Sequence, residues 1–322
     1  TRCCRRVTLT KTYRRAVSVY ITPSQYMKKL LFISVLFLIS HSTRATAQVG
    51  DIIIWNGDTL SLFSNPLELR LDWEKLHKII LKELFITDSI AHLERYGTSK
   101  EYESGISSDC WRGYIAEWNI LNNKIYLSNI YSCINPKNKL DLEKVFPSEY
   151  HDGLVFAYWI KNKLIIPKGE CIEYIHLDYR SIYDKEIVLN VMNGYIKKAK
   201  EYDNIIVKRS KFSLDPNPSA MQDFAYSLID WEKFHDFNGR HILVTVGIIP
   251  KLNGRFGKID WKYTYALDND KFITDRNNIY IREAIRVAKL IPEWDVIIQR
   301  QRIVGCGLGL LFDDNNKEKY KR

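Results

Sequence analysis

The stretch from Asn278 to Phe312 constrains the fold most, because an amphipathic helix, a proline and an apolar β segment follow one another there. Apolar residues recur with the helical spacing i, i+3, i+4 and i+7, at Ile281, Ala284, Ile285 and Ala288. Asn278 is a suitable N-cap, and Pro292 cannot continue a helix. The sequence therefore predicts one surface helix that ends one or two residues before Pro292.

Two apolar segments after this helix have the composition of strands, Val296 to Gln299 and Arg302 to Phe312. Within the second, glycine occupies every other position from Gly305 to Gly309, so one face of the strand lacks side chains. A bare face often marks a place where a helix or another backbone packs closely. We therefore expect a helix to lie across these glycines. No helix is expected directly after them, so we do not expect a dinucleotide-binding fingerprint.

The wording of this stretch, REAIRVAKLIPEWDVIIQRQRIV, resembles the C-terminal domain of TonB-type proteins of the Bacteroidetes kind. The matching positions are Glu283-Ala284, Arg286-Val287, Pro292-Glu293-Trp294 and Arg300. The resemblance covers roughly residues 231–322 and implies a small helix-on-sheet domain. The last strand of that family usually carries a proline near its end, where this chain has glycines.

In that family the edge of the small sheet pairs with an extended segment of a partner protein, and the resemblance implies the same here. The partner would be a segment of an envelope or outer-membrane protein, and a link to TonB-type outer-membrane transport is part of this expectation. The expected partner-binding edge consists of Arg302, Ile303, Val304, Gly305, Cys306, Gly307, Leu308, Gly309 and Leu310.

The beginning of the chain contains a typical export signal. Met27-Lys28-Lys29 is followed by an apolar run to Ser40 and by Ala45-Thr46-Ala47, a small-residue cleavage site. The run is shorter than the roughly 20 residues that span a bilayer. The sequence therefore predicts a periplasmic protein without a membrane span after cleavage, and upstream translation over residues 1–26. An uncleaved signal, which would anchor the chain, is the alternative.

The charge of the chain gives no reason to expect binding to nucleic acid. Nine of the 48 basic residues and none of the 38 acidic residues precede Gln48, which leaves 39 against 38 after cleavage. The basic balance of the full chain thus belongs to its first residues.

From residue 48 onward the sequence is rich in strand patterns. Asn56-Gly57 and the short connection Leu121-Asn122-Asn123 favour hairpins, and a helix is expected over Leu71 to Ile86. Another hairpin is expected around Lys161-Asn162-Lys163. The pattern CWRGYxAxW, KxYL, VFAxW resembles an uncharacterised bacterial family over roughly residues 51–196 and implies a fold unit without a reaction.

Aromatic residues are dense in this β-rich part, where they usually form a core or cross-strand pairs. If they were exposed around a hollow, Trp111, Trp118 and Trp159 would instead form a ligand- or glycan-binding site. This alternative function, in which the β-rich part binds a ligand or is a hydrolase, would leave the C-terminal sheet for homodimerisation.

The search for catalytic and metal-binding groups finds no constellation, so we expect a non-enzymatic protein without cofactor or metal. His151-Asp152 and His176 near Cys171 lack the spacing of a metal site. Cys110 and Cys133 lie on strands expected to pair, so a disulfide between them is possible in an exported protein. Isolated buried thiols are the alternative.

The sequence predicts an α+β protein in which an antiparallel β-rich domain precedes a small helix-on-sheet domain. The expected organisation is upstream translation over 1–26, signal peptide over 27–47, β-rich domain over 48–196, connection over 197–218 and C-terminal domain over 219–322.

Overall fold

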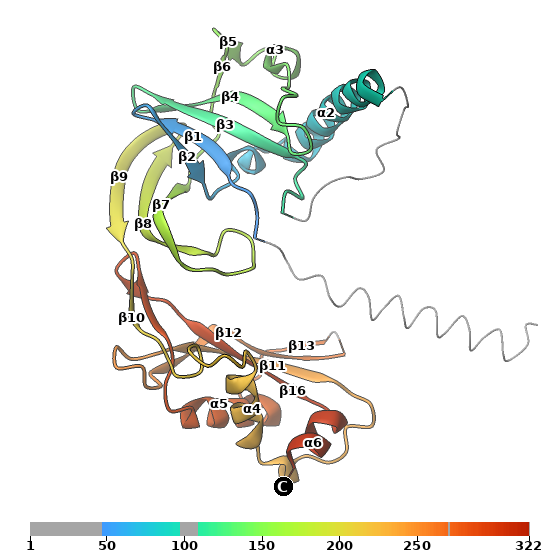
Figure 1. Cartoon of the computed structure of the whole chain (residues 1–322), viewed down its shortest axis with the longest axis vertical. Coiled ribbons are helices and arrows are strands. Elements are labelled where there is room, and N and C mark those ends of the chain that lie inside the picture. The colour runs from blue at the N-terminus through green and yellow to red at the C-terminus, as the bar shows by residue number, and fades with distance from the viewer. Residues whose placement is uncertain (1–46, 97–108, 270, 322) are drawn as a thin grey trace, which may run out of the picture. The chain divides into compact units, whose positions relative to one another are not determined.

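The computed structural model describes residues 47–96, 109–269 and 271–321. The expected upstream segment and nearly all of the expected signal peptide lie outside these residues. The described chain is a mixed α+β structure dominated by strands (Figure 1). Contacts join its described residues into one unit. This unit contains two separate hydrophobic cores, and each is built on its own sheet.

The first core lies inside a strongly curved sheet with the strand order β2-β1-β3-β4-β9-β8-β7. Its strands are β1 (Asp51–Trp55), β2 (Asp58–Leu62), β3 (Tyr114–Leu121), β4 (Lys124–Ser132), β7 (Lys163–Glu173), β8 (Ile182–Met192) and β9 (Tyr195–Asp203). The neighbours are antiparallel except β1 and β3, which are parallel. The two end strands meet, since the N–H of Phe63 just after β2 donates to the carbonyl of Ile165 in β7 at 2.8 Å.

Tight turns that begin with asparagine set the register of this sheet. Asn56-Gly57, Asn122-Asn123 and Asn193-Gly194 all have positive φ, as the two central residues of a type I′ hairpin require. They join β1 to β2, β3 to β4 and β8 to β9. The first two hairpins confirm the predictions from sequence.

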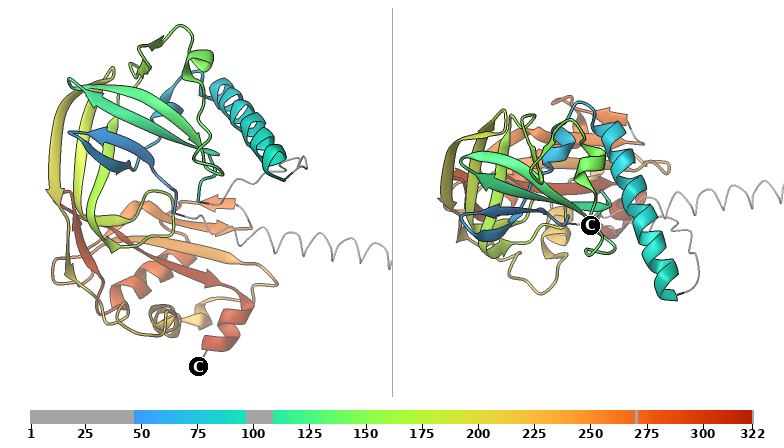
Figure 2. Two further views of the ribbon diagram at one scale, coloured as in Figure 1. Left: turned by 45° about the horizontal axis from the view of Figure 1, so that its top comes forward. Right: turned by 90° about the horizontal axis from the view of Figure 1, so that it is seen from above.

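The remaining elements of this part are two short helices, one long helix and two short strands that pair with each other and join the same sheet through β4 (Figure 2). They are η1 (Pro66–Leu69), α2 (Trp73–Tyr96), α3 (Leu142–Val145), β5 (Tyr150–His151) and β6 (Leu154–Phe156). The predicted helix over Leu71 to Ile86 corresponds to the first half of α2. Its buried residues Leu76, Ile80 and Leu84 recur every four positions and join a core that includes Ile53 and Trp118.

Two predictions for this part need correction. The segments around Lys161-Asn162-Lys163 do not form a hairpin, because β6 pairs with β4 and β5 while β7 pairs with β8. The segment 197–218 is not simply a connection either. It contains most of β9 and all of β10 (Ile205–Lys208), and β9 is a central strand of the curved sheet.

A disulfide joins Cys110 to Cys133, with 6.4 Å between the Cα atoms. Cys110 precedes β3 and Cys133 follows β4, so the bond closes the open end of the β3–β4 hairpin. Of the two alternatives for these cysteines, the structure therefore has the disulfide. The described free cysteines are Cys171, which is exposed, and Cys306.

The second core lies between a four-stranded antiparallel sheet and the helices on one of its faces (Figure 1). The sheet has the order β13-β12-β11-β16, with β11 (Ile242–Ile249), β12 (Lys258–Asp268), β13 (Lys271–Ile273) and β16 (Cys306–Phe312). The helices are α4 (Ala220–Ser227), η2 (Trp231–Lys233), α5 (Ile279–Leu290) and α6 (Asp314–Tyr320).

Helix α5 forms as predicted. The side chain of Asn278 accepts hydrogen bonds from the N–H groups of Tyr280 at 3.0 Å and Ile281 at 3.3 Å, which caps the helix. Ile281, Ala284 and Ala288 are fully buried against the sheet. The helix ends at Leu290, ahead of Pro292.

The predicted last strand, Arg302 to Phe312, is divided between two sheets. β15 (Arg302–Ile303) pairs with β14 (Val296–Gln299) in a three-stranded sheet of order β10-β14-β15. Only β16 belongs to the four-stranded sheet, where it pairs with β11. Across residues 47–96, 109–269 and 271–321, no helix has the length and apolarity needed to cross a membrane.

Candidate functional site

The outer edge of β16 is the strongest candidate for a binding site. β16 is the last strand of the order β13-β12-β11-β16, so one of its sides is paired with β11 and the other faces away from the sheet. A strand in this position presents unpaired N–H and C=O groups to which another chain can add. We call this side of residues 305–311 the β16 edge.

Side chains from the helices cover the end of the β16 edge. Gln222 of α4 donates to the carbonyl of Gly309, and the N–H of Leu311 donates to the hydroxyl of Tyr226 at 2.9 Å. The carbonyl of Leu311 accepts from the side-chain amide of Asn316 at 3.1 Å. These three bonds show that Gly309 and Leu311 direct their backbone groups away from β11.

The beginning of the β16 edge is open in the described part of the chain. Backbone groups alternate along a strand, so Gly307 directs its N–H and C=O to the same side as Gly309. No side chain or backbone group of another described element bonds to Gly307 there. The open portion therefore extends from Gly305 to the N–H of Gly309.

The glycine face of β16 is open as well. A Cβ atom at Gly309 would meet no described atom within 4 Å, and at Gly307 it would meet only the carbonyl oxygen of Val246 at 4.0 Å. The helices pack instead on the opposite face, where Leu308, Leu310 and Phe312 are buried. The expectation that a helix lies across the glycines is therefore wrong, because the side chains that a helix can bury point the other way.

Apolar side chains on the neighbouring strands extend this open face. Cross-strand register puts Leu243 of β11 beside Leu267 of β12, which is beside Phe272 of β13. Leu243 is 40% and Phe272 is 60% exposed. Phe272 stacks on Tyr265 with 4.4 Å between the ring centroids. These apolar side chains lie level with Leu311, at the covered end of the edge, whereas the open portion lies beside Thr245 and Gly247 of β11.

The nine residues expected to form the partner-binding edge do not all lie on it. Arg302 and Ile303 are paired with β14, and the N–H of Val304 donates to the carbonyl of Ile297 at 2.8 Å. Leu308 and Leu310 belong to β16, but their side chains are buried in the core. The part that remains as an open edge is centred on Gly305, Cys306, Gly307 and Gly309.

The three tryptophans proposed as ligand-binding residues do not form a common site. Trp118 is fully buried, and its indole N–H donates to Asp51 at 3.0 Å. Trp159 packs edge-on against it at 6.4 Å and donates to the carbonyl of Pro66 at 2.9 Å. Trp111 is separate and 55% exposed. The interpretation of these residues as core and cross-strand partners holds for Trp118 and Trp159.

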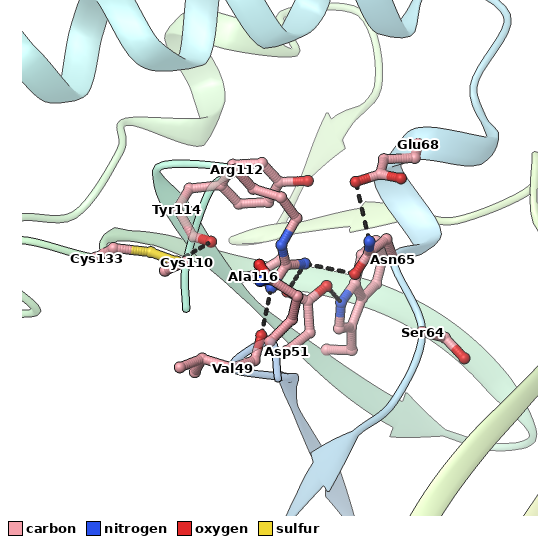
Figure 3. Close-up of polar contacts among 12 residues, drawn as sticks. Val49, Asp51, Ser64, Asn65, Glu68, Cys110, Arg112, Tyr114, Ala116 and Cys133 are labelled. Atoms are coloured by element: carbon pink, nitrogen blue, oxygen red, sulfur yellow. Dashed lines mark hydrogen bonds and ion pairs between the residues drawn. A yellow bond between two sulfur atoms is a disulfide. The ribbon is translucent and has the colours of Figure 1, made fainter. Parts of the chain in front are cut away.

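A buried ion pair at the start of the curved sheet is the densest polar cluster near these tryptophans (Figure 3). Arg112 donates to the carboxylate of Asp51 at 2.8 Å, to the side-chain carbonyl of Asn65 at 2.7 Å and to the backbone carbonyl of Val49 at 2.8 Å. Asp51 also accepts from the N–H of Ala116 at 3.1 Å. The cluster ties β1 and β3 to the loop before η1.

The burial of this pair decides its role. The Arg112 side chain is 1% exposed and that of Asp51 is fully buried. Burial raises the pKa of the Asp51 carboxyl above its ordinary value, against the lowering effect of Arg112 and of the N–H donors of Trp118 and Ala116. Because neither group reaches solvent, we assign the pair a structural role. The described residues contain no group of three His, Cys, Asp or Glu side chains placed to hold a metal.

Sequence reasoning missed the residues that shape both places. Ser219 and Gln222 have the spacing of a capping box, but Ser219 makes no side-chain cap and Gln222 bonds to β16 instead. Asp51 and Arg112 are far apart in sequence, and the signal in the sequence that could have indicated their pairing was a charged residue beside an apolar run.

Comparison with protein-family models, with curated proteins and with solved structures finds no match for this chain.

Proposed function

We propose that this chain is an exported, non-enzymatic binding protein whose C-terminal sheet accepts an extended segment of a partner protein beside β16. The observation that carries the proposal is the open portion of the β16 edge, where Gly307 and Gly309 leave the backbone accessible. Main-chain hydrogen bonds would supply the affinity of such a complex, and alternate side chains of the added strand would lie beside the open glycine face of β16.

The proposal keeps the TonB-like interpretation of residues 231–322 as its guide to the kind of partner. An amphipathic helix on a small antiparallel sheet, with the last strand at the rim, supports that interpretation. The partner would then be a segment of an envelope or outer-membrane protein, met in the periplasm. The open portion of the β16 edge is only a few residues long, which supports a short extended segment as the partner strand.

A photocrosslinking experiment tests the proposal. Benzoylphenylalanine is placed at Gly309, where a side chain has free space beside the open edge, and as a matched control at Phe272 on the opposite rim of the same sheet. Leu308 is unsuitable because its side chain is buried. We expect a heterologous adduct from position 309 that maps to one extended segment, and none from position 272.

The variant Gly307→Pro sharpens the test, because proline removes an edge N–H and is tolerated where that N–H faces solvent. The adduct from position 309 should be lost in this variant while the thermal unfolding curve stays close to that of the parent. Equal adducts from 309 and 272, or an adduct that persists in Gly307→Pro, would refute strand addition. An adduct between two copies of this chain would instead support the dimerisation alternative.

A further inference from the structure

A groove of about 620 Å³ runs along the solvent side of α5, the helix whose other side covers the four-stranded sheet. The groove shares no residue with the β16 edge, since none of its lining side chains comes from β16. Four cations line it together with a single carboxylate: Lys233, Arg282, Arg286, Lys289 and Glu283.

The helix arranges these side chains in a stripe. Arg282, Arg286 and Lys289 are spaced i, i+4 and i+7, which places them on one side of α5 over about 10 Å of its axis. Ile285 lies on the same side, between the first and the last cation, and lines the groove. Ile279, which is 49% exposed, lines the groove as well. The groove therefore alternates positive charge with apolar surface.

The charges of this stripe are only partly balanced. Glu283 is buried and accepts from Arg286 at 3.0 Å and from the N–H of Asp230 at 2.9 Å. Lys233 pairs with Asp230 at 3.0 Å and approaches Glu283 at 3.5 Å. Arg282 and Lys289 are exposed and have no acidic partner within the described residues. Two cations at the ends of the stripe are thus available to an external anion.

We propose that the α5 groove binds an acidic segment of a partner protein, with carboxylates against Arg282 and Lys289 and an apolar side chain against Ile285. The cations are distributed along the groove, whereas a free phosphate needs donors that converge on one point. None of the described residues that line the groove is aromatic, so this lining lacks the stacking surface that single-stranded nucleic acid uses. Charge complementarity and the apolar residue between the cations favour an acidic peptide.

Fluorescence anisotropy with a short labelled peptide of alternating glutamate and leucine tests the proposal. The double variant Arg282→Ala/Lys289→Ala should weaken binding about tenfold, because each exposed charge pair contributes up to about fivefold in affinity. The matched control Lys251→Ala/Lys271→Ala removes two other exposed lysines from the same part of the chain and should change the affinity less than about twofold. Binding should weaken further as salt is added.

Three outcomes would overturn the proposal. They are equal weakening in the two double variants, equal binding of a lysine–leucine peptide, and a preference for a single-stranded DNA oligonucleotide that the Arg282→Ala/Lys289→Ala variant abolishes. Thermal unfolding of the variants shows whether the fold is kept. The Gly307→Pro variant should bind the acidic peptide normally, so failure at this groove and failure at the β16 edge are distinguishable.

Discussion

The two larger sheets of this chain differ in whether their edge strands are paired. In the curved sheet the end strands β2 and β7 meet, and Phe63 and Ile165 are joined by a backbone hydrogen bond of 2.8 Å. In the four-stranded sheet β16 remains at the rim, and only the end of its outer side is covered by side chains of α4 and α6. A sheet that closes on itself gives up its edges, and one that stays open keeps a place for another strand.

The two regions also differ in where they bury charge. The curved sheet holds both Asp51 and Arg112 out of contact with solvent. In the second region Glu283 is also buried, but its partner Arg286 is 39% exposed, and Asp295 and its partner Arg209 are both partly exposed. In the first region both members of one ion pair, Asp51 and Arg112, are thus withdrawn from solvent. The second distributes its charges around α5 and the segment that follows it.

The largest expected effect tests this buried ion pair. Asp51→Ala leaves Arg112 buried without its carboxylate, which costs about 3–5 kcal/mol of unfolding free energy. Chemical denaturation measures the loss, and hydrogen exchange should place it in β1 and β3. The control Asp58→Ala removes an exposed carboxylate from the same hairpin and should stay within about 0.5 kcal/mol. Equal losses of protection in β11 and β16 would contradict the contrast between the regions.

A smaller effect is expected from filling two glycines of the second sheet. A Cβ at Gly247 would lie 2.8 Å from the carbonyl oxygen of Asp260 and 2.9 Å from the Cβ of Tyr263, so Gly247→Ala should cost about 1–3 kcal/mol. Gly309→Ala meets nothing and should change stability by less than about 0.5 kcal/mol. Urea denaturation compares them. Similar losses in both variants would mean that the glycine face of β16 is not open.

The smallest effect concerns acid. Burial alone would raise the pKa of both Glu283 and Asp295. Hydrogen bonds from Arg286 and the N–H of Asp230 nevertheless bring the pKa of Glu283 below its ordinary value of 4.5. Hydrogen bonds from Ser210, Ser213 and Arg209 likewise bring the pKa of Asp295 below its ordinary value of 3.8. A carboxyl with a lowered folded pKa stabilises the fold above its ordinary pKa, and the benefit disappears as pH falls through the folded value.

The pKa of Asp51 is raised, so acid does not weaken the curved sheet through this group. Hydrogen exchange followed from about pH 5 to pH 3 should therefore show loss of protection in α5 and β14 before β1. In Glu283→Gln, which cannot titrate at this position, the fall in stability across this range should be smaller than in the parent. If β1 lost protection first, the direction of the pKa shift assigned to one of the two regions would be wrong.

The elements with strong local signals were predictable. The period of Ile281, Ala284 and Ala288 and the cap Asn278 determine α5, and the asparagine turns determine the hairpins of the curved sheet. Local chemistry decides these elements, because hydrogen bonds and burial are made within a few residues. β16 lies at the rim of its sheet.

The elements that depend on distant partners were not predictable. β9 carries three lysines and a glutamate and has no fully buried residue, so its sequence looks like a polar connection, although it pairs with β8 along its length. The parallel pairing of β1 with β3 joins residues more than sixty positions apart. The strand pattern breaks at Val304 and Gly305, so that Arg302 pairs with β14 and does not continue into β16; apolar composition alone does not show this break.

The disulfide has one more consequence for the β3–β4 hairpin. The Asn122-Asn123 turn joins the two strands at one end, and the Cys110–Cys133 bond joins them at the other. The hairpin is therefore a covalent ring, so a single break of the peptide chain in its exposed turn would open the ring without releasing either strand from the molecule.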